Sequence, residues 1–250
     1  MKTRLGFLLL ALASNSQGAS VFFSQTVTAA GDPLGGLSGT GNLPVYAPIR
    51  ESAASQILGY AEVTLGANNG QVASFPRTDG TDTYIYQQVA AGVNAFTSLN
   101  FRFVSSDGAN LPVPAITIGV SELYIRVDGR ALSTGGGFVT PEETNTLTLA
   151  GVQPTTWEVV SDLGIINDTI NSGTLTYTAI ETLSTPSQFI QWRAFDPEGD
   201  DSITGLTWRL DNEGGALNAT HLQMDLSPIP EPASALLGAI GLLGLLRRRR

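Results

Sequence analysis

The sequence predicts an all-β fold, an antiparallel two-sheet β-sandwich that is jelly-roll-like. Three observations lead to this fold class. Apolar and polar residues alternate in many short stretches, turn-forming residues separate these stretches, and no long segment has the 3.6-residue periodicity of a helix. Ten or more strands at such spacing are typical of two packed sheets in one domain.

The strands are predicted from alternation that places apolar side chains on one face and Thr, Arg, Asp or Gln on the other. The clearest example is residues 206–211, where Leu and Trp alternate with Thr, Arg and Asp. In chain order the predicted strands are residues 21–29, 57–65, 83–89, 95–104, 123–128, 146–149, 155–160, 174–178, 187–195, 206–211 and 221–226.

Turn signals lie between these segments. Gly next to Asn, Asp or Ser favours tight connections at residues 68–70, 78–80, 107–108, 128–129 and 171–173, and a Gly pair does so at 213–215. Residues 31–41 are loop-like, and a Gly- and Pro-rich stretch at 134–143 could mark a domain boundary. One domain is the favoured interpretation, because neither half alone has enough strands to close well.

The N-terminal end has the organisation of a secretory signal. Lys2 and Arg4 precede an apolar run at residues 5–13, and small residues follow it. We therefore predict a signal peptide at residues 1–19, with cleavage either after Ala13 or near Gly18–Ala19.

The C-terminal end combines a break, a short apolar run and a cluster of cations. Residues 233–246 carry no charge, and as a helix they span only about 21 Å of a hydrocarbon core of roughly 30 Å. Arg247, Arg248, Arg249 and Arg250 would remain on the cytoplasmic side of a membrane. Pro230 and Pro232 end the helix on the other side. The segment is therefore predicted to be a marginal membrane anchor.

These C-terminal features resemble the PEP-CTERM sorting signal of exported bacterial proteins. The matching parts are Pro230-Glu231-Pro232, the apolar run 233–246 and the four terminal arginines. The resemblance implies recognition and cutting by exosortase, a membrane-embedded cysteine transpeptidase-like enzyme. It also implies an inner-membrane stage after the secretion translocon and a final place at the cell surface or in extracellular polysaccharide. The bodies of such proteins vary widely, so no site residue is transferred to the remainder of the chain.

The predicted exported domain, residues 20–227, is acidic. Removing the two ends (1–19 and 228–250) leaves seven basic and 21 acidic residues, a net charge near −14. Such a surface disfavours nucleic acid as a partner. The chain has no Cys and a single His, which excludes thiol catalysis, zinc–thiolate sites and multi-histidine metal sites.

The densest polar feature is FDPEGDDS, at residues 195–202. Asp196, Glu198 and Asp200 recur at every second position, as the oxygen ligands of Ca²⁺ do in a binding loop, and Asp201 follows them. The spacing does not match an EF-hand, because the twelfth position is Thr207. A jelly-roll calcium site would instead add ligands from another loop, such as Asp211 or Glu213. A solvated acidic turn between two strands is the favoured alternative to a calcium site. No other cofactor is predicted.

Aromatic residues raise the hypothesis of sugar stacking. Tyr84 and Tyr86 flank Ile85 on a polar strand and are the best stacking candidates, although packing within the sheet is the favoured interpretation. Trp157, Trp192 and Trp208 share faces with aliphatic residues and are expected in the core. His221 is expected at the surface, on the polar face of the last strand.

Two function classes follow from these observations, and a third has less support. The first is a non-enzymatic protein of the cell surface or extracellular matrix, with exosortase and extracellular polysaccharide as partners. The second is a carbohydrate-binding module whose ligand is held with or without calcium. A glycoside hydrolase would need two paired carboxylates, and no sequence context marks such a pair.

Overall fold

The computed structural model describes residues 18–35, 44–69, 74–78, 82–92, 94–128, 141, 143–151, 155–183, 188–198, 202–214 and 218–227. For residues 74–78, 218 and 219 it describes the backbone alone. The predicted signal peptide, apart from residues 18 and 19, and the whole C-terminal sorting segment lie outside these ranges.

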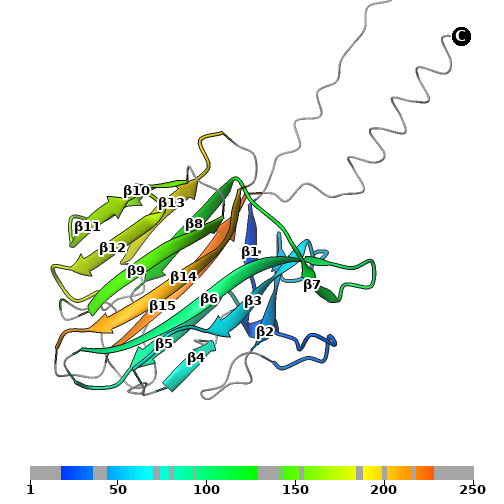
Figure 1. Ribbon diagram of the computed structural model, residues 1–250, viewed down its shortest axis with the longest axis horizontal. Coiled ribbons are helices and arrows are strands. Elements are labelled where there is room, and N and C mark those ends of the chain that lie inside the picture. Colours follow the sequence, from blue (N-terminus) through cyan, green and yellow to red (C-terminus); the bar gives the residue numbers. More distant parts are fainter. Residues whose placement is uncertain are drawn as a thin grey trace, which may run out of the picture.

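The described chain is built almost entirely of strands, which confirms the all-β prediction (Figure 1). A single turn of 3-10 helix, Phe23–Gln25, is its one helical element. The strands are β1 (Ala19–Val21), β2 (Val45–Arg50), β3 (Gly59–Leu65), β4 (Ser74–Thr78), β5 (Tyr84–Val89), β6 (Ala95–Ser106), β7 (Pro112–Thr117), β8 (Glu122–Asp128), β9 (Glu143–Gly151), β10 (Thr156–Ser161), β11 (Ile166–Asn171), β12 (Thr174–Ala179), β13 (Phe189–Phe195), β14 (Ile203–Asn212) and β15 (Asn218–Leu226).

The prediction of two separate sheets was wrong. All pairings between the named strands are antiparallel, and they join the strands into one continuous sheet in the order β10-β13-β8-β15-β1-β2-β3-β6-β14-β9-β12-β11. Strands β4, β5 and β7 branch from this path. The continuity arises at β1, where Ala19 pairs with Leu226 of β15 and Val21 pairs with Ile49 of β2. The result is a nearly closed, barrel-like sheet rather than a sandwich of two independent layers.

The two ends of the path approach each other through side chains. Trp157 of β10 donates its indole N–H to the carbonyl oxygen of Gly173, in the turn between β11 and β12, at 3.0 Å. Trp192 of β13 donates to the Asp168 carboxylate of β11 at 3.3 Å. The ring of Trp192 also lies 4.4 Å, centroid to centroid, from Tyr177 of β12. Two tryptophans therefore link the ends where no ladder hydrogen bonds are described.

The interior is filled by the apolar half of each alternating strand. Trp192, Trp208, Leu99, Phe103 and Leu222 are all fully buried, as the alternation predicts. Trp208 also donates its indole N–H to the Asn145 side chain at 3.0 Å, so its one polar atom is satisfied inside the core. Every second residue of these strands points the other way, onto the outer face of the sheet.

One predicted strand was mostly wrong, and four observed strands were not predicted. Residues 21–29 contain only the end of β1, followed by the 3-10 turn. Strands β2, β4, β7 and β11 were not predicted: β2, β4 and β7 each contain proline, and β11, with the sequence INDTIN, is mostly polar. Among the described residues no helix is long and apolar enough to cross a membrane, and the apolar run 233–246 lies outside them.

A bulge at the start of β14 depends on glycine. The pairing of β14 with β9 shifts register between Ile203 and Gly205. A Cβ atom on Gly205 would lie 2.1 Å from the backbone oxygen of Phe101, whereas a Cβ on Gly108 would meet no atom within 4 Å.

We expect Gly205→Ala to lower the free energy of unfolding by about 1–3 kcal/mol or more, because the added methyl group collides with backbone that cannot move cheaply. The matched control Gly108→Ala should change it by less than about 0.5 kcal/mol. Urea denaturation followed by tryptophan fluorescence measures both. Equal midpoints for the two variants would contradict the described close approach of Gly205 to the backbone of β6.

Candidate functional site

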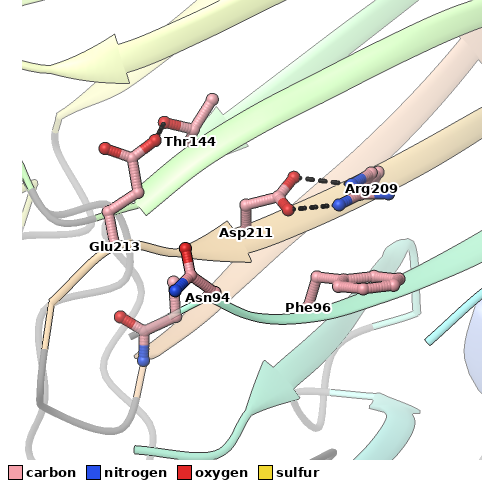
Figure 2. A pocket seen from close by; sticks show the side chains of 7 residues that line it. Asn94, Phe96, Thr144, Arg209, Asp211 and Glu213 are labelled. Atoms are coloured by element: carbon pink, nitrogen blue, oxygen red, sulfur yellow. Dashed lines mark hydrogen bonds and ion pairs between the residues drawn. The ribbon is translucent and has the colours of Figure 1, made fainter. Parts of the chain in front are cut away.

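A shallow pocket of about 350 Å³ lies on the outer face of the sheet, near the C-terminal end of β14 (Figure 2). Register explains its composition: Asp211 of β14 lies directly opposite Phe96 of β6 on one side and Thr144 of β9 on the other. Directly opposite residues point to the same face, so these three side chains meet outside the barrel. The lining residues are Asn94, Phe96, Thr144, Arg209, Asp211, Asn212 and Glu213.

Arg209 lies beside Asp211 and Phe96 in this group (Figure 2). Its Nε and Nη2 atoms donate to the two carboxylate oxygens of Asp211 at 2.7 and 2.6 Å. Its guanidinium carbon lies 3.9 Å from the centroid of the Phe96 ring. The hydrogen bonds from Arg209 to Asp211 raise the pKa of Arg209 further above its usual value. The guanidinium is therefore a permanently charged plane, held on one side by a carboxylate and below by an aromatic ring.

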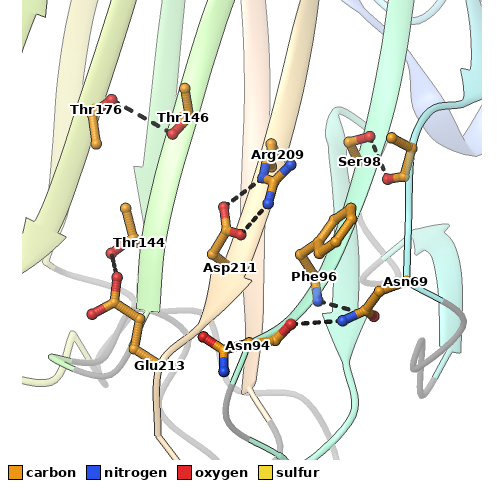
Figure 3. Close-up of polar contacts among 11 residues, drawn as sticks. Asn69, Asn94, Phe96, Ser98, Thr144, Thr146, Thr176, Arg209, Asp211 and Glu213 are labelled. Carbon is orange, nitrogen blue, oxygen red and sulfur yellow. Dashed lines mark hydrogen bonds and ion pairs between the residues drawn. The ribbon is translucent and has the colours of Figure 1, made fainter.

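The rim of the pocket is fixed by a loop. Asn69 donates its side-chain N–H to the carbonyl oxygen of Asn94 at 2.6 Å and accepts from the backbone N–H of Phe96 at 3.3 Å (Figure 3). Asn94 has a positive φ of 66°, a conformation that asparagine tolerates better than most residues. On the opposite rim, Thr144 donates to Glu213 at 2.8 Å. The pocket is therefore organised by its own hydrogen bonds.

Two parallel lines of threonines extend the polar surface away from the pocket. We call them the threonine rows. Their hydroxyl oxygens pair across β9 and β12: Thr144 with Thr178 at 3.3 Å, Thr146 with Thr176 at 3.5 Å and Thr148 with Thr174 at 3.4 Å. All six side chains are half-buried or exposed, and Figure 3 shows the Thr146–Thr176 pair beside Arg209 and Asp211.

Charges further along β6 are paired as well. Arg102 makes two hydrogen bonds to the Glu62 carboxylate of β3, at 3.1 and 2.9 Å. Tyr46 of β2 donates its hydroxyl to the same carboxylate at 2.9 Å. Burial first, and then Glu62, raise the pKa of Tyr46 to about 12, so this phenol stays neutral and keeps its hydrogen. Between this cluster and Arg209 the outer face carries the uncharged side chains of Asn100 and Thr207, which hydrogen-bond at 2.9 Å.

The tyrosines named as the best candidates for sugar stacking lie elsewhere, and packing within the sheet was the favoured interpretation for them. Tyr84 and Tyr86 of β5 are each only 1% exposed, so neither ring presents a face to a ligand. They lie against His221, with ring centroids 6.4 and 5.3 Å away. The expectation that His221 is a surface residue was wrong, because this aromatic group buries it completely.

The acidic turn is described only in part. The Asp196 carboxylate accepts the backbone N–H of Glu198 at 2.9 Å, a local turn interaction. Asp200 and Asp201 lie outside the described residues. Within the described ranges no three acidic or histidine side chains are grouped as a metal site would require. The calcium hypothesis stays a prediction.

The pocket was not predicted from the sequence, and of its residues only Asp211 and Glu213 were named, as added ligands for calcium. Phe96, Arg209 and Asp211 were recognised as strand residues, and the last two as the polar face of their strand. Their meeting depends on the pairing of β6 with β14, which are more than 100 residues apart. The available signal was the spacing Arg209-Leu210-Asp211, which places a cation and an anion on one face of a strand.

The comparisons with known proteins concern the C-terminal end. A family model described as the PEP-CTERM protein-sorting motif matches residues 228–250, which include Pro230, Glu231, Pro232 and the arginines 247–250. No curated protein matches the chain. The resemblance inferred from the sequence is thus confirmed, while the comparisons assign nothing to the barrel-like domain. The chain carries a PEP-CTERM sorting motif at its C-terminus, the signal of exported proteins that exosortase processes and sorts to the cell surface.

Proposed function

We propose that this protein is a non-enzymatic component of the cell surface or extracellular matrix, and that it contacts extracellular polysaccharide through the Arg209 pocket. The sorting motif supports the location. The observation that carries the binding half is the Arg209–Asp211 pair stacked on Phe96 in an open pocket. Planar hydrogen-bonding groups beside an aromatic ring suit a sugar, which presents hydroxyls at its edge and C–H groups on its faces.

The state of the pocket carboxylates supports binding over hydrolysis. Both oxygens of Asp211 accept hydrogen bonds from Arg209, and Glu213 accepts from Thr144. A hydrolase needs one carboxylic acid that donates a proton and a second carboxylate that attacks or activates water. Carboxylates that already accept hydrogen bonds from neighbouring side chains instead hold those side chains in place and so fix the shape of a binding surface.

The route to the surface follows from the lengths of the two ends. The N-terminal signal takes the chain to the translocon, and the short apolar run 233–246 holds it briefly in the inner membrane. The positive charge of the last four residues keeps them on the inner side. Exosortase then cuts near Pro230–Ala233 and releases the domain outward. Residue 19, the predicted last residue of the signal peptide, is buried in β1, which favours the earlier of the two cleavage positions.

Mass spectrometry of the protein recovered from the cell surface tests this route. We expect a C-terminus near Pro230–Ala233 and an N-terminus that retains Ala19, because Ala19 pairs with Leu226 in the ladder. Deleting exosortase should leave the uncut chain in the membrane fraction. Extracellular protein that still ends at Arg250 would contradict the proposed processing.

Variants at the pocket test polysaccharide binding. Arg209→Gln removes a charged, bidentate hydrogen-bonding group, and we expect binding of the host's extracellular polysaccharide to weaken roughly tenfold or more. The matched control is Arg193→Gln. Arg193 pairs with Glu158 at 2.8 Å and lies over the Phe195 ring at 4.8 Å, but on β13. Biolayer interferometry with immobilised polysaccharide measures both, and equal loss in the two variants would contradict a specific pocket.

Calcium removal separates the pocket from the acidic turn. The turn precedes Ile203 and the pocket surrounds Asp211, so they lie at opposite ends of β14, about 27 Å apart along the strand. We expect binding to survive EGTA, because the hydrogen-bonding groups of the pocket are complete without a metal. Loss of binding in EGTA that added Ca²⁺ restores would instead place the carbohydrate-binding function at Asp196–Asp201.

A further inference from the structure

On the outer face next to the pocket, polar side chains are regularly arranged beyond the residues that line the pocket itself. Side chains from five neighbouring strands line up across the sheet in register. One line contains Ser98, Arg209, Thr146, Thr176 and Thr169, from β6, β14, β9, β12 and β11. The next line, two residues further along each strand, contains Asn100, Thr207, Thr148, Thr174 and Asn171.

Together these two lines of side chains form a continuous polar strip, which we call the track. Neighbouring strands lie about 4.8 Å apart, so a line of five side chains extends roughly 19 Å across the sheet. Thr146 and Thr176 are half-buried, while Thr148, Thr169 and Asn171 are exposed. The track begins at the Arg209 pocket and runs to β11, at the end of the sheet path.

The hydroxyl groups retain hydrogen-bonding capacity for a ligand. Each hydroxyl has one hydrogen to donate and two lone pairs to accept. A Thr–Thr pair such as Thr146–Thr176 uses one hydrogen, so the second hydroxyl can still donate and both can still accept. Each threonine also carries a methyl group, so this surface offers both polar and apolar atoms to a sugar.

The charge distribution selects the class of ligand. Beyond Arg209 both lines carry only Ser, Thr and Asn, while residues 20–227 as a whole have a net charge near −14. A polyanion would be repelled by the domain and would find one cation in these two lines of residues, already paired with Asp211. An uncharged chain of hydroxyl-bearing units loses nothing to this repulsion.

We infer that the ligand of this face is an extended neutral polysaccharide, which lies across β14, β9, β12 and β11 with one section in the Arg209 pocket. This inference rests on the proposed function and goes beyond it by naming the ligand class and the path of the chain. The threonines of these rows then determine specificity, because their hydroxyls hydrogen-bond to successive sugar units beyond the pocket.

The test uses the processed exported protein and a panel of neutral glucans, mannans and galactans, each supplied as a polymer and as a series of oligosaccharides. Polygalacturonate is the anionic counterpart. The double variant Thr146→Val, Thr176→Val removes two hydroxyls and keeps the side-chain shape. Thr117→Val, at an exposed threonine of β7, is the matched control. Thermal melting confirms that each variant is folded.

For at least one neutral glycan we expect affinity to rise with chain length beyond three units. The double Val variant should lose about three- to tenfold in affinity for long chains and little for short ones, with Thr117→Val unchanged. Binding that needs Arg209 but shows no length dependence and no effect of the valines would overturn the extended path and leave the pocket proposal standing. Tighter binding to polygalacturonate than to every neutral glycan would overturn the ligand class. No glycan binding by the unmodified protein would overturn the proposed binding function itself, and this inference with it.

Discussion

The alternation of side chains along each strand is the constraint on which this structure depends. In β14 the indole of Trp208 is buried and hydrogen-bonded to Asn145, while the next residue, Arg209, points outward and stacks on Phe96. Burial of the first fixes the position of the second, since the two share one backbone. A slip of one residue would place the guanidinium in the core and the indole in water. The interior therefore sets the geometry of the outer face.

This coupling matters because the chain has no disulfide to stabilise it. With no cysteine in the sequence, the domain relies on apolar burial and on a ladder of strands that is continuous through β1. The buried tryptophans contribute both to apolar burial and to the connection between strands. Trp157 and Trp192 fill the space between the two ends of the sheet path and also donate hydrogen bonds across it, to Gly173 and Asp168. A protein that is exported and then works outside the cell keeps its shape without redox chemistry.

The parts of this molecule that could be predicted from sequence are the local ones. Strands β8, β12, β14 and β15 follow from alternation of period two, and the turn at Ser172–Gly173 follows from its residue types. The sorting motif is likewise contiguous. The continuity of the sheet through β1 was missed because three residues carry it, too few for a pattern. The pocket was missed because Phe96 and Arg209 meet only through a pairing between distant strands. The burial of Tyr84 and Tyr86 agrees with packing within the sheet, which the sequence favoured over sugar stacking.

The place of β1 has a mechanical consequence. Leu226, at the end of β15, lies between Ala19 of β1 and Leu123 of β8, so the first and last strands of the domain are neighbours. Their hydrogen bonds run perpendicular to the strands. Suppose that the domain is attached at its C-terminal side while its outer face binds a polymer. A force between these two points acts along β15, and it stresses these hydrogen bonds together instead of one at a time. In that case the pairing of β1 with β15, which makes the sheet continuous, also bears the load, and it resists shear better than a strand edge whose bonds open one after another.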